Sequence, residues 1–155
     1  MNEHINMFDN SNISALNLIK WTQFGRYLSI LAIITGIIVR LIQYINNRSL
    51  WLDEVNLALN IINRSYRELA QTLDYNQAAP LGFLWLEKLI TQIWSDSEYA
   101  LRFFPFISSI VALGVFFRLV SLYSSALAAP IAIALFAFGR YTVYYATNSN
   151  PIIAI

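Results

Sequence analysis

The sequence predicts an all-α membrane protein with about four transmembrane helices. Its residues are 57% hydrophobic and only 12% charged, and the mean hydropathy is +0.52. Soluble domains carry roughly twice that charged share, so this chain has too little polar surface to dissolve as a domain of ordinary composition. The aromatic share of 15% agrees, because Trp and Tyr collect at membrane interfaces.

Charge and residue usage exclude several classes of function. The net charge is +1, so no basic field indicates a nucleic-acid partner. The chain has no cysteine and a single histidine, His4, which excludes disulfides, thiolate metal sites and sites built on several histidines. A metal ion would therefore need carboxylate ligands.

Apolar and polar stretches divide the chain into a tail and a transmembrane module. Residues 1–26 are polar and Asn-rich and predict an N-terminal tail, and residues 27–155 form the module. No small-residue cleavage site follows the first apolar run, which indicates a retained anchor and not a signal peptide. The expected spans cover about 27–45, 80–94, 103–123 and 127–145.

The stretch 46–79 predicts two short amphipathic helices on the membrane surface. Leu52, Val55, Leu59 and Ile62 share one helical face. Further along, Ser65 and Glu68 have the spacing of a capping box.

The positive charges before the first span predict the orientation. Lys20 and Arg26 precede it, and the positive-inside rule keeps such residues in the cytoplasm. The loop 46–79 is then expected on the outer side.

Two adjacent carboxylates, Asp53 and Glu54, follow the first span within the segment SLWLDE. One interpretation is a helix start, in which Asp53 caps the helix or favours its dipole. The other is a carboxylate held at the membrane surface as a general base or a metal ligand. The residues alone leave both interpretations open.

Four segments in order resemble the membrane glycosyltransferases of the GT-C fold, which include protein O-mannosyltransferases and lipid A aminoarabinose transferases. They are SLWLDE after the first span, DYNQAAPLGFLWLEKL into the second, SEYALRFFPF into the third, and the closing YYATNSNP. The resemblance covers about residues 27–150. It departs from the family at Ala79-Pro80, where relatives have two prolines.

The resemblance implies a transferase that uses a polyprenyl-phosphate-linked sugar and an acceptor outside the cytoplasm. It implies Asp53 as the catalytic carboxylate that activates an acceptor hydroxyl, directly or with a divalent cation that Asp53 would ligate. By position Glu54 would support catalysis, and Arg102 would contact substrate. The acceptor would displace the polyprenyl phosphate with inversion.

The leading interpretation is therefore the N-terminal module of such a transferase in a bacterial plasma membrane, inactive as this chain alone. Its expected partners are the lipid bilayer, the lipid-linked donor and a separate C-terminal half of the enzyme. The rival interpretation is a small non-enzymatic membrane protein, such as an assembly subunit or a transporter fragment.

Overall fold

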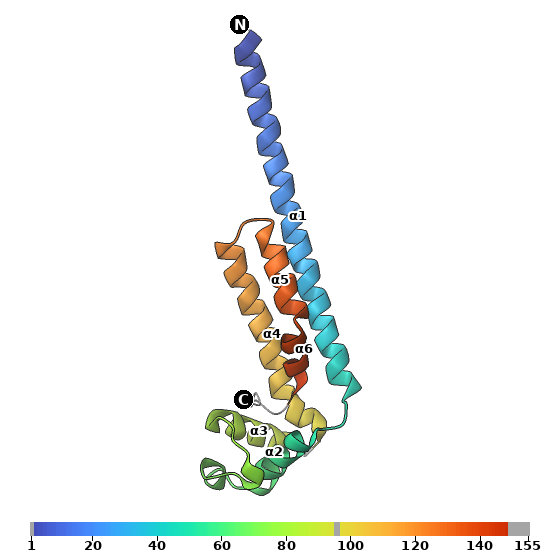
Figure 1. Ribbon diagram of the computed structural model, residues 1–155, viewed down its shortest axis with the longest axis vertical. Helices are drawn as coiled ribbons and strands as arrows, with labels where there is room; N and C mark the ends of the chain where they lie inside the picture. Colours follow the sequence, from blue (N-terminus) through green and yellow to red (C-terminus); the bar gives the residue numbers. More distant parts are fainter. Residues whose placement is uncertain (1, 95–96, 149–155) are drawn as a thin grey trace. The chain divides into compact units, whose positions relative to one another are not determined.

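The structure, a computed structural model, describes the backbone of residues 2–94 and 97–148 and the side chains from Lys20 onward in those ranges. All regular elements in these ranges are helical, which confirms the all-α prediction (Figure 1). The α-helices are α1 (Asn2–Asn46), α2 (Leu52–Asn63), α3 (Leu81–Ile93), α4 (Glu98–Tyr123), α5 (Ala128–Phe138) and α6 (Arg140–Tyr144). Three 3₁₀ turns are η1 (Glu68–Ala70), η2 (Asp74–Asn76) and η3 (Tyr145–Thr147).

Two helices are long and apolar enough to cross a membrane. They are the Lys20–Asn46 part of α1 and the whole of α4. Helices α3 and α5 have 13 and 11 residues, fewer than the roughly 17–25 that a span needs. The described residues therefore give two candidate spans where the sequence predicted four.

Two helices begin earlier than the sequence predicted. α1 begins at Asn2, so the backbone of the expected N-terminal tail is helical. This stretch has no Pro or Gly before Gly25, so nothing stops a helix that continues from the apolar run. α4 begins at Glu98 and not near residue 103, because Ser97 caps it: the Ala100 N–H donates to Ser97 Oγ at 3.3 Å.

The chain forms two compact units. The first unit contains the residues up to Gly36 and Leu113–Gly139, and the second contains Ile37–Ala112 and the residues from Arg140 on. Long helices α1 and α4 each contribute to both units.

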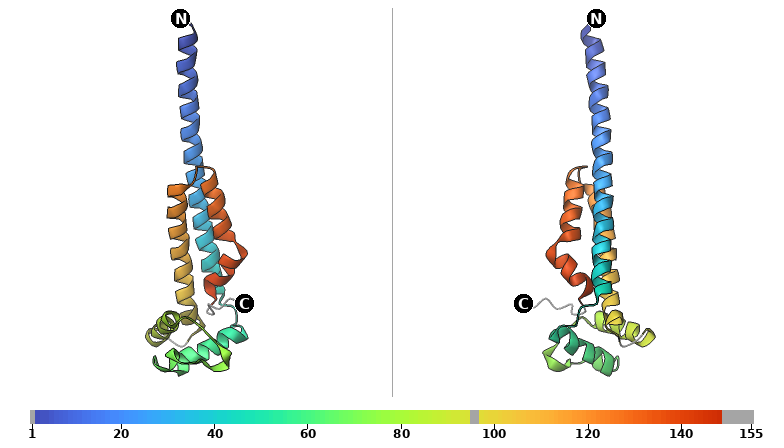
Figure 2. Two further views of the ribbon diagram at one scale, coloured as in Figure 1. Left: turned by 60° about the vertical axis from the view of Figure 1, so that its left-hand side comes forward. Right: turned by 90° about the vertical axis from the view of Figure 1, so that its right-hand side faces the viewer.

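In the first unit, segments of α1, α4 and α5 run side by side (Figure 2). Phe116 of α4 stacks on Phe136 of α5 with ring centroids 4.3 Å apart. Gly25 of α1 is buried, and a Cβ there would overlap the carbonyl oxygen of Ala126. This close approach of helix and turn requires glycine at position 25.

In the second unit, α2 packs on α3 with η1 and η2 beside them. The core consists of buried side chains from these elements and from α4: Leu57, Ala58, Ile61, Leu69, Leu73, Leu84 and Leu101. The predicted apolar face of α2 is not the one that packs in this core. Leu52, Val55 and Leu59 are exposed, so α2 keeps a second apolar face outside the core.

Polar contacts hold the loop between α2 and α3. The Asn60 side-chain amide makes two hydrogen bonds with the backbone of Asp74. Its Oδ1 accepts a hydrogen bond from the Asp74 N–H at 2.9 Å, and its Nδ2 donates one to the Asp74 carbonyl at 3.3 Å. Arg64 pairs with the Asp74 carboxylate at 2.7 Å. Lys88 Nζ donates to the Ile61 carbonyl at 3.0 Å, which satisfies an orphan acceptor at the end of α2.

The predicted capping box is confirmed, but the helix that it begins is short. The Ser65 N–H donates to Glu68 Oε2 at 2.7 Å, and the Glu68 N–H donates to Ser65 Oγ at 3.4 Å. These bonds lower the pKa of the Glu68 carboxyl. The element that follows is the three-residue turn η1, where the sequence predicted a second amphipathic helix.

Candidate active site at the start of α2

The first turn of α2 is tied together by Glu54 and not by Asp53. Trp51 is the N-cap residue, and its backbone N–H donates to Glu54 Oε2 at 2.9 Å. A carboxylate at this third helical position satisfies an orphan donor and favours the helix dipole. The interpretation of Asp53 as the N-cap is therefore wrong, although Asp53 does lie in the first turn.

Glu54 also pairs with Arg102 inside the second unit. Arg102 Nη2 lies 3.6 Å from Glu54 Oε2, and the two residues are 0% and 1% exposed, respectively. The structure thus brings together two of the three predicted site residues, on α2 and α4. Removing one partner of such a buried pair typically costs about 3–5 kcal/mol, because the other charge stays buried. This geometry gives the side chains of Glu54 and Arg102 a structural role.

Asp53 differs from Glu54 both in its exposure and in its polar contacts. Its side chain is exposed, and the described part of the chain offers it no hydrogen bond or ion pair. Exposed Trp51 and Leu52 precede it. Of the two adjacent carboxylates, Asp53 is the one that remains available to a ligand.

An arginine that the sequence interpretation did not single out lies beside this turn. The Arg48 guanidinium lies over the Tyr144 ring at 4.8 Å and over the Trp51 ring at 6.0 Å. Such cation–π contacts orient a guanidinium without neutralising it. The sequence offered one signal, an arginine three positions before Trp51, but only the fold brings Tyr144 to it.

The segment that resembles the family before the second span has an unusual backbone. Tyr75 and Asn76 both have positive φ, 60° and 54°, a left-handed conformation that a bulky residue such as tyrosine seldom adopts. Asp74 anchors this turn through Arg64 and Asn60. The exposed Tyr75 ring is thereby held outside the core.

The described side chains around Asp53 do not form a metal site. In residues 20–94 and 97–148, where side chains are described, no three His, Cys, Asp or Glu residues gather closely enough to hold an ion. Glu54 is directed to Arg102, so Asp53 is the single available carboxylate of this turn. These residues do not make a complete ligand set for a metal ion.

A third carboxyl, Glu87 of α3, lies apart from this turn along the chain and is buried. It is 0% exposed, and neither oxygen has a hydrogen-bond partner among the described residues. Burial raises its pKa from 4.5 to about 9. The group is therefore neutral at physiological pH.

The end of the YYATNSNP segment lies outside the described residues, so its later asparagines have no place in this geometry. Comparisons with protein-family models, curated proteins and solved structures give no match to this chain.

Proposed function

We propose that the chain is the N-terminal module of a multi-pass membrane glycosyltransferase of the GT-C type. In this proposal the module lies in a bacterial plasma membrane and handles a polyprenyl-phosphate-linked sugar on the outer side. The observation that carries the proposal is the different burial and pairing of the two adjacent carboxylates in the SLWLDE turn. Glu54 is buried against Arg102, whereas Asp53 is exposed, and the Arg48 guanidinium lies over the ring of Trp51 in the same turn.

The site's setting supports a lipid-linked substrate. The turn follows directly on a helix that is long and apolar enough to cross a membrane, and α2 presents an exposed apolar face. A donor whose phosphate is attached to a polyprenyl chain would meet a protein at the membrane surface. In this proposal the apolar face of α2 rests on that surface and keeps Asp53 near the headgroups.

The proposed reaction is an inverting transfer. The Asp53 carboxylate accepts the proton of an acceptor hydroxyl as the hydroxyl oxygen forms a bond to the anomeric carbon of the donor. The bond between that carbon and the phosphate oxygen breaks, and the polyprenyl phosphate leaves with the electron pair. Arg48 stabilises the negative charge that develops on the leaving phosphate.

A transfer assay with matched variants tests the proposal. It measures the passage of labelled sugar from polyprenyl phosphomannose or polyprenyl phosphoaminoarabinose, the donors that the resemblance implies, in the transferase assembled from this chain and the spans that complete it. Asp53→Asn should lose ~100-fold or more of the rate, the size of a lost general base, at unchanged protein level. Arg48→Gln should lower the rate, with Arg67→Gln as a control for the loss of one exposed positive charge.

Glu54→Gln gives the complementary result. It should lower the amount of folded protein because it leaves Arg102 buried without its counter-charge. If Asp53→Asn retained near-normal transfer, the first turn would be a helix start only. The rival, a non-enzymatic membrane protein, would then gain support.

A further inference from the structure

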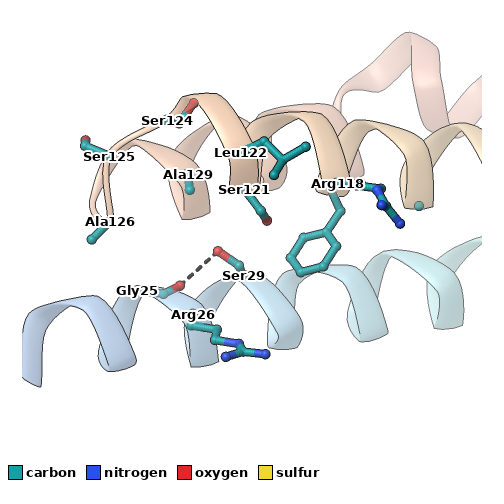
Figure 3. Close-up of a pocket in the computed structure, with 12 residues that line it drawn as sticks. Gly25, Arg26, Ser29, Arg118, Ser121, Leu122, Ser124, Ser125, Ala126 and Ala129 are labelled. Atoms are coloured by element: carbon teal, nitrogen blue, oxygen red, sulfur yellow. Dashed lines mark hydrogen bonds between the residues drawn. The ribbon is translucent and has the colours of Figure 1, made fainter. Parts of the chain in front are cut away.

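The first unit contains a cavity of about 700 Å³ that is separate from the Asp53 turn (Figure 3). It is lined by residues of α1, α4, the turn between α4 and α5, and the start of α5: Gly25, Arg26, Ser29, Gly114, Phe117, Arg118, Ser121, Leu122, Ser124, Ser125, Ala126 and Ala129. Ligand pockets typically measure roughly 300–1,000 Å³, so the volume suits a small polar group.

The cavity lining combines two arginines with several hydroxyls. Arg26 comes from α1 and Arg118 from α4, and both side chains are exposed. Ser29 and Ser121 point toward one another across the space (Figure 3). The Ser29 hydroxyl donates to the Gly25 carbonyl at 2.9 Å, which leaves its oxygen free to accept.

Nothing anionic in the described part of this unit balances the two arginines. Lys20, Arg26 and Arg118 are its cations among residues 20–36 and 113–139, and these ranges contain no Asp or Glu. Arginines that line a cavity with no carboxylate beside them attract an anionic ligand. The positive charge of the cavity lining therefore favours an anionic ligand.

The position of the cavity along the helices indicates the kind of anion. Arg26 lies near the start of the first candidate span and Arg118 near the end of α4. The Ser124–Leu127 turn joins α4 to α5 at the same place. The ends of apolar helices lie at the level of lipid headgroups, where basic pockets bind anionic lipids.

We propose that this cavity binds the phosphodiester headgroup of an anionic glycerophospholipid such as phosphatidylglycerol. Arg26 and Arg118 pair with the phosphate oxygens, and Ser121 donates a hydroxyl hydrogen bond to the same group. The acyl chains extend along the exposed apolar surface of the unit. Snorkelling of two unrelated arginines into water is the competing explanation.

Lipid retention by the purified full chain tests this site. Native mass spectrometry compares phosphatidylglycerol with the zwitterionic phosphatidylcholine. Wild-type protein should prefer the anionic lipid by at least about tenfold, as expected for charge-assisted pairs. The double substitution Arg26→Gln with Arg118→Gln should remove the preference, whereas Arg67→Gln, which removes an exposed charge in the second unit, should keep it.

A steric variant tests the cavity without changing any charge. Gly114 lines it, and a Cβ there meets nothing within 4 Å, so Gly114→Leu places bulk in open space. We expect Gly114→Leu to lower phosphatidylglycerol retention. Gly82 of α3 has equally open surroundings, and Gly82→Leu is the matched control.

Three outcomes would overturn the proposal: no preference for the anionic lipid, a preference that survives both the double substitution and Gly114→Leu, or displacement of the lipid by inorganic phosphate. Stronger binding of undecaprenyl phosphate than of phosphatidylglycerol would reassign the site to a donor lipid and also overturn it. Asp53→Asn should leave lipid retention unchanged, so failure of this proposal is distinguishable from failure of the transferase proposal.

Discussion

Replacing the buried carboxyl of α3 should stabilise the protein increasingly as the pH rises. Glu87 is fully buried, and burial raises its pKa to about 9 from 4.5. Because the folded pKa lies above the unfolded one, the folded state binds the proton more tightly, and stability falls as the pH rises from 4.5 toward 9. A pH of 7.5 lies three units above the unfolded pKa of 4.5. At 1.36 kcal/mol per unit, keeping this group protonated in the folded state therefore costs roughly 4 kcal/mol of folding free energy.

Glu87→Gln removes this cost while it keeps the size of the side chain. Urea unfolding in detergent micelles, followed by far-ultraviolet circular dichroism, should show similar stability for variant and wild type near pH 4.5. The free energy of unfolding of the variant should then rise steadily relative to that of wild type up to pH 8.5. Glu68→Gln is the matched control, because the pKa of this exposed carboxyl is lowered and its loss should bring no gain with pH. A stability difference between Glu87→Gln and wild type that stays constant from pH 4.5 to 8.5 would show that burial does not raise the pKa of Glu87.

Three further predictions concern the second unit and the topology. Glu54→Gln should destabilise the fold by about 3–5 kcal/mol in the same unfolding assay, because Arg102 stays buried without its counter-charge, and an unchanged midpoint would contradict the structural role of the pair. Ser65→Ala should cost about 1 kcal/mol of local stability, measured as faster amide exchange in η1; unchanged exchange would count against the capping box. The chain lacks cysteine, so a cysteine at exposed Asn63 should react with an impermeant thiol reagent in intact cells, and one at Asn10, before the first candidate span, should not; the reverse pattern would invert the orientation.

Helix content was predictable from the sequence because it follows from local apolar runs and caps. The capping box at Ser65 is a case in which two residues three apart decide the bonds by themselves. The length of α1 was not predicted, because a polar composition suggested a tail although no helix breaker precedes Gly25. The second expected span nearly coincides with α3, but the 13 residues of this helix are too few to cross a membrane.

The roles of the adjacent carboxylates were beyond the reach of the sequence alone. Asp53 and Glu54 have similar chemistry, and their difference arises from Arg102, which is far along the chain and meets Glu54 only in the fold. The same holds for Arg48, whose orientation depends on Tyr144. The buried face of α2 was also chosen by tertiary packing, since apolar residues occur on more than one side of this helix.

The most direct test of Asp53 as the catalytic base is the transfer rate of Asp53→Asn relative to wild type, at equal amounts of folded protein in the assembled transferase. Asparagine keeps the size of the side chain but cannot accept the acceptor's proton. Asp53→Asn is expected to lose ~100-fold or more of the rate with donor binding retained. A rate within a few-fold of wild type would contradict the assignment of Asp53 as the base.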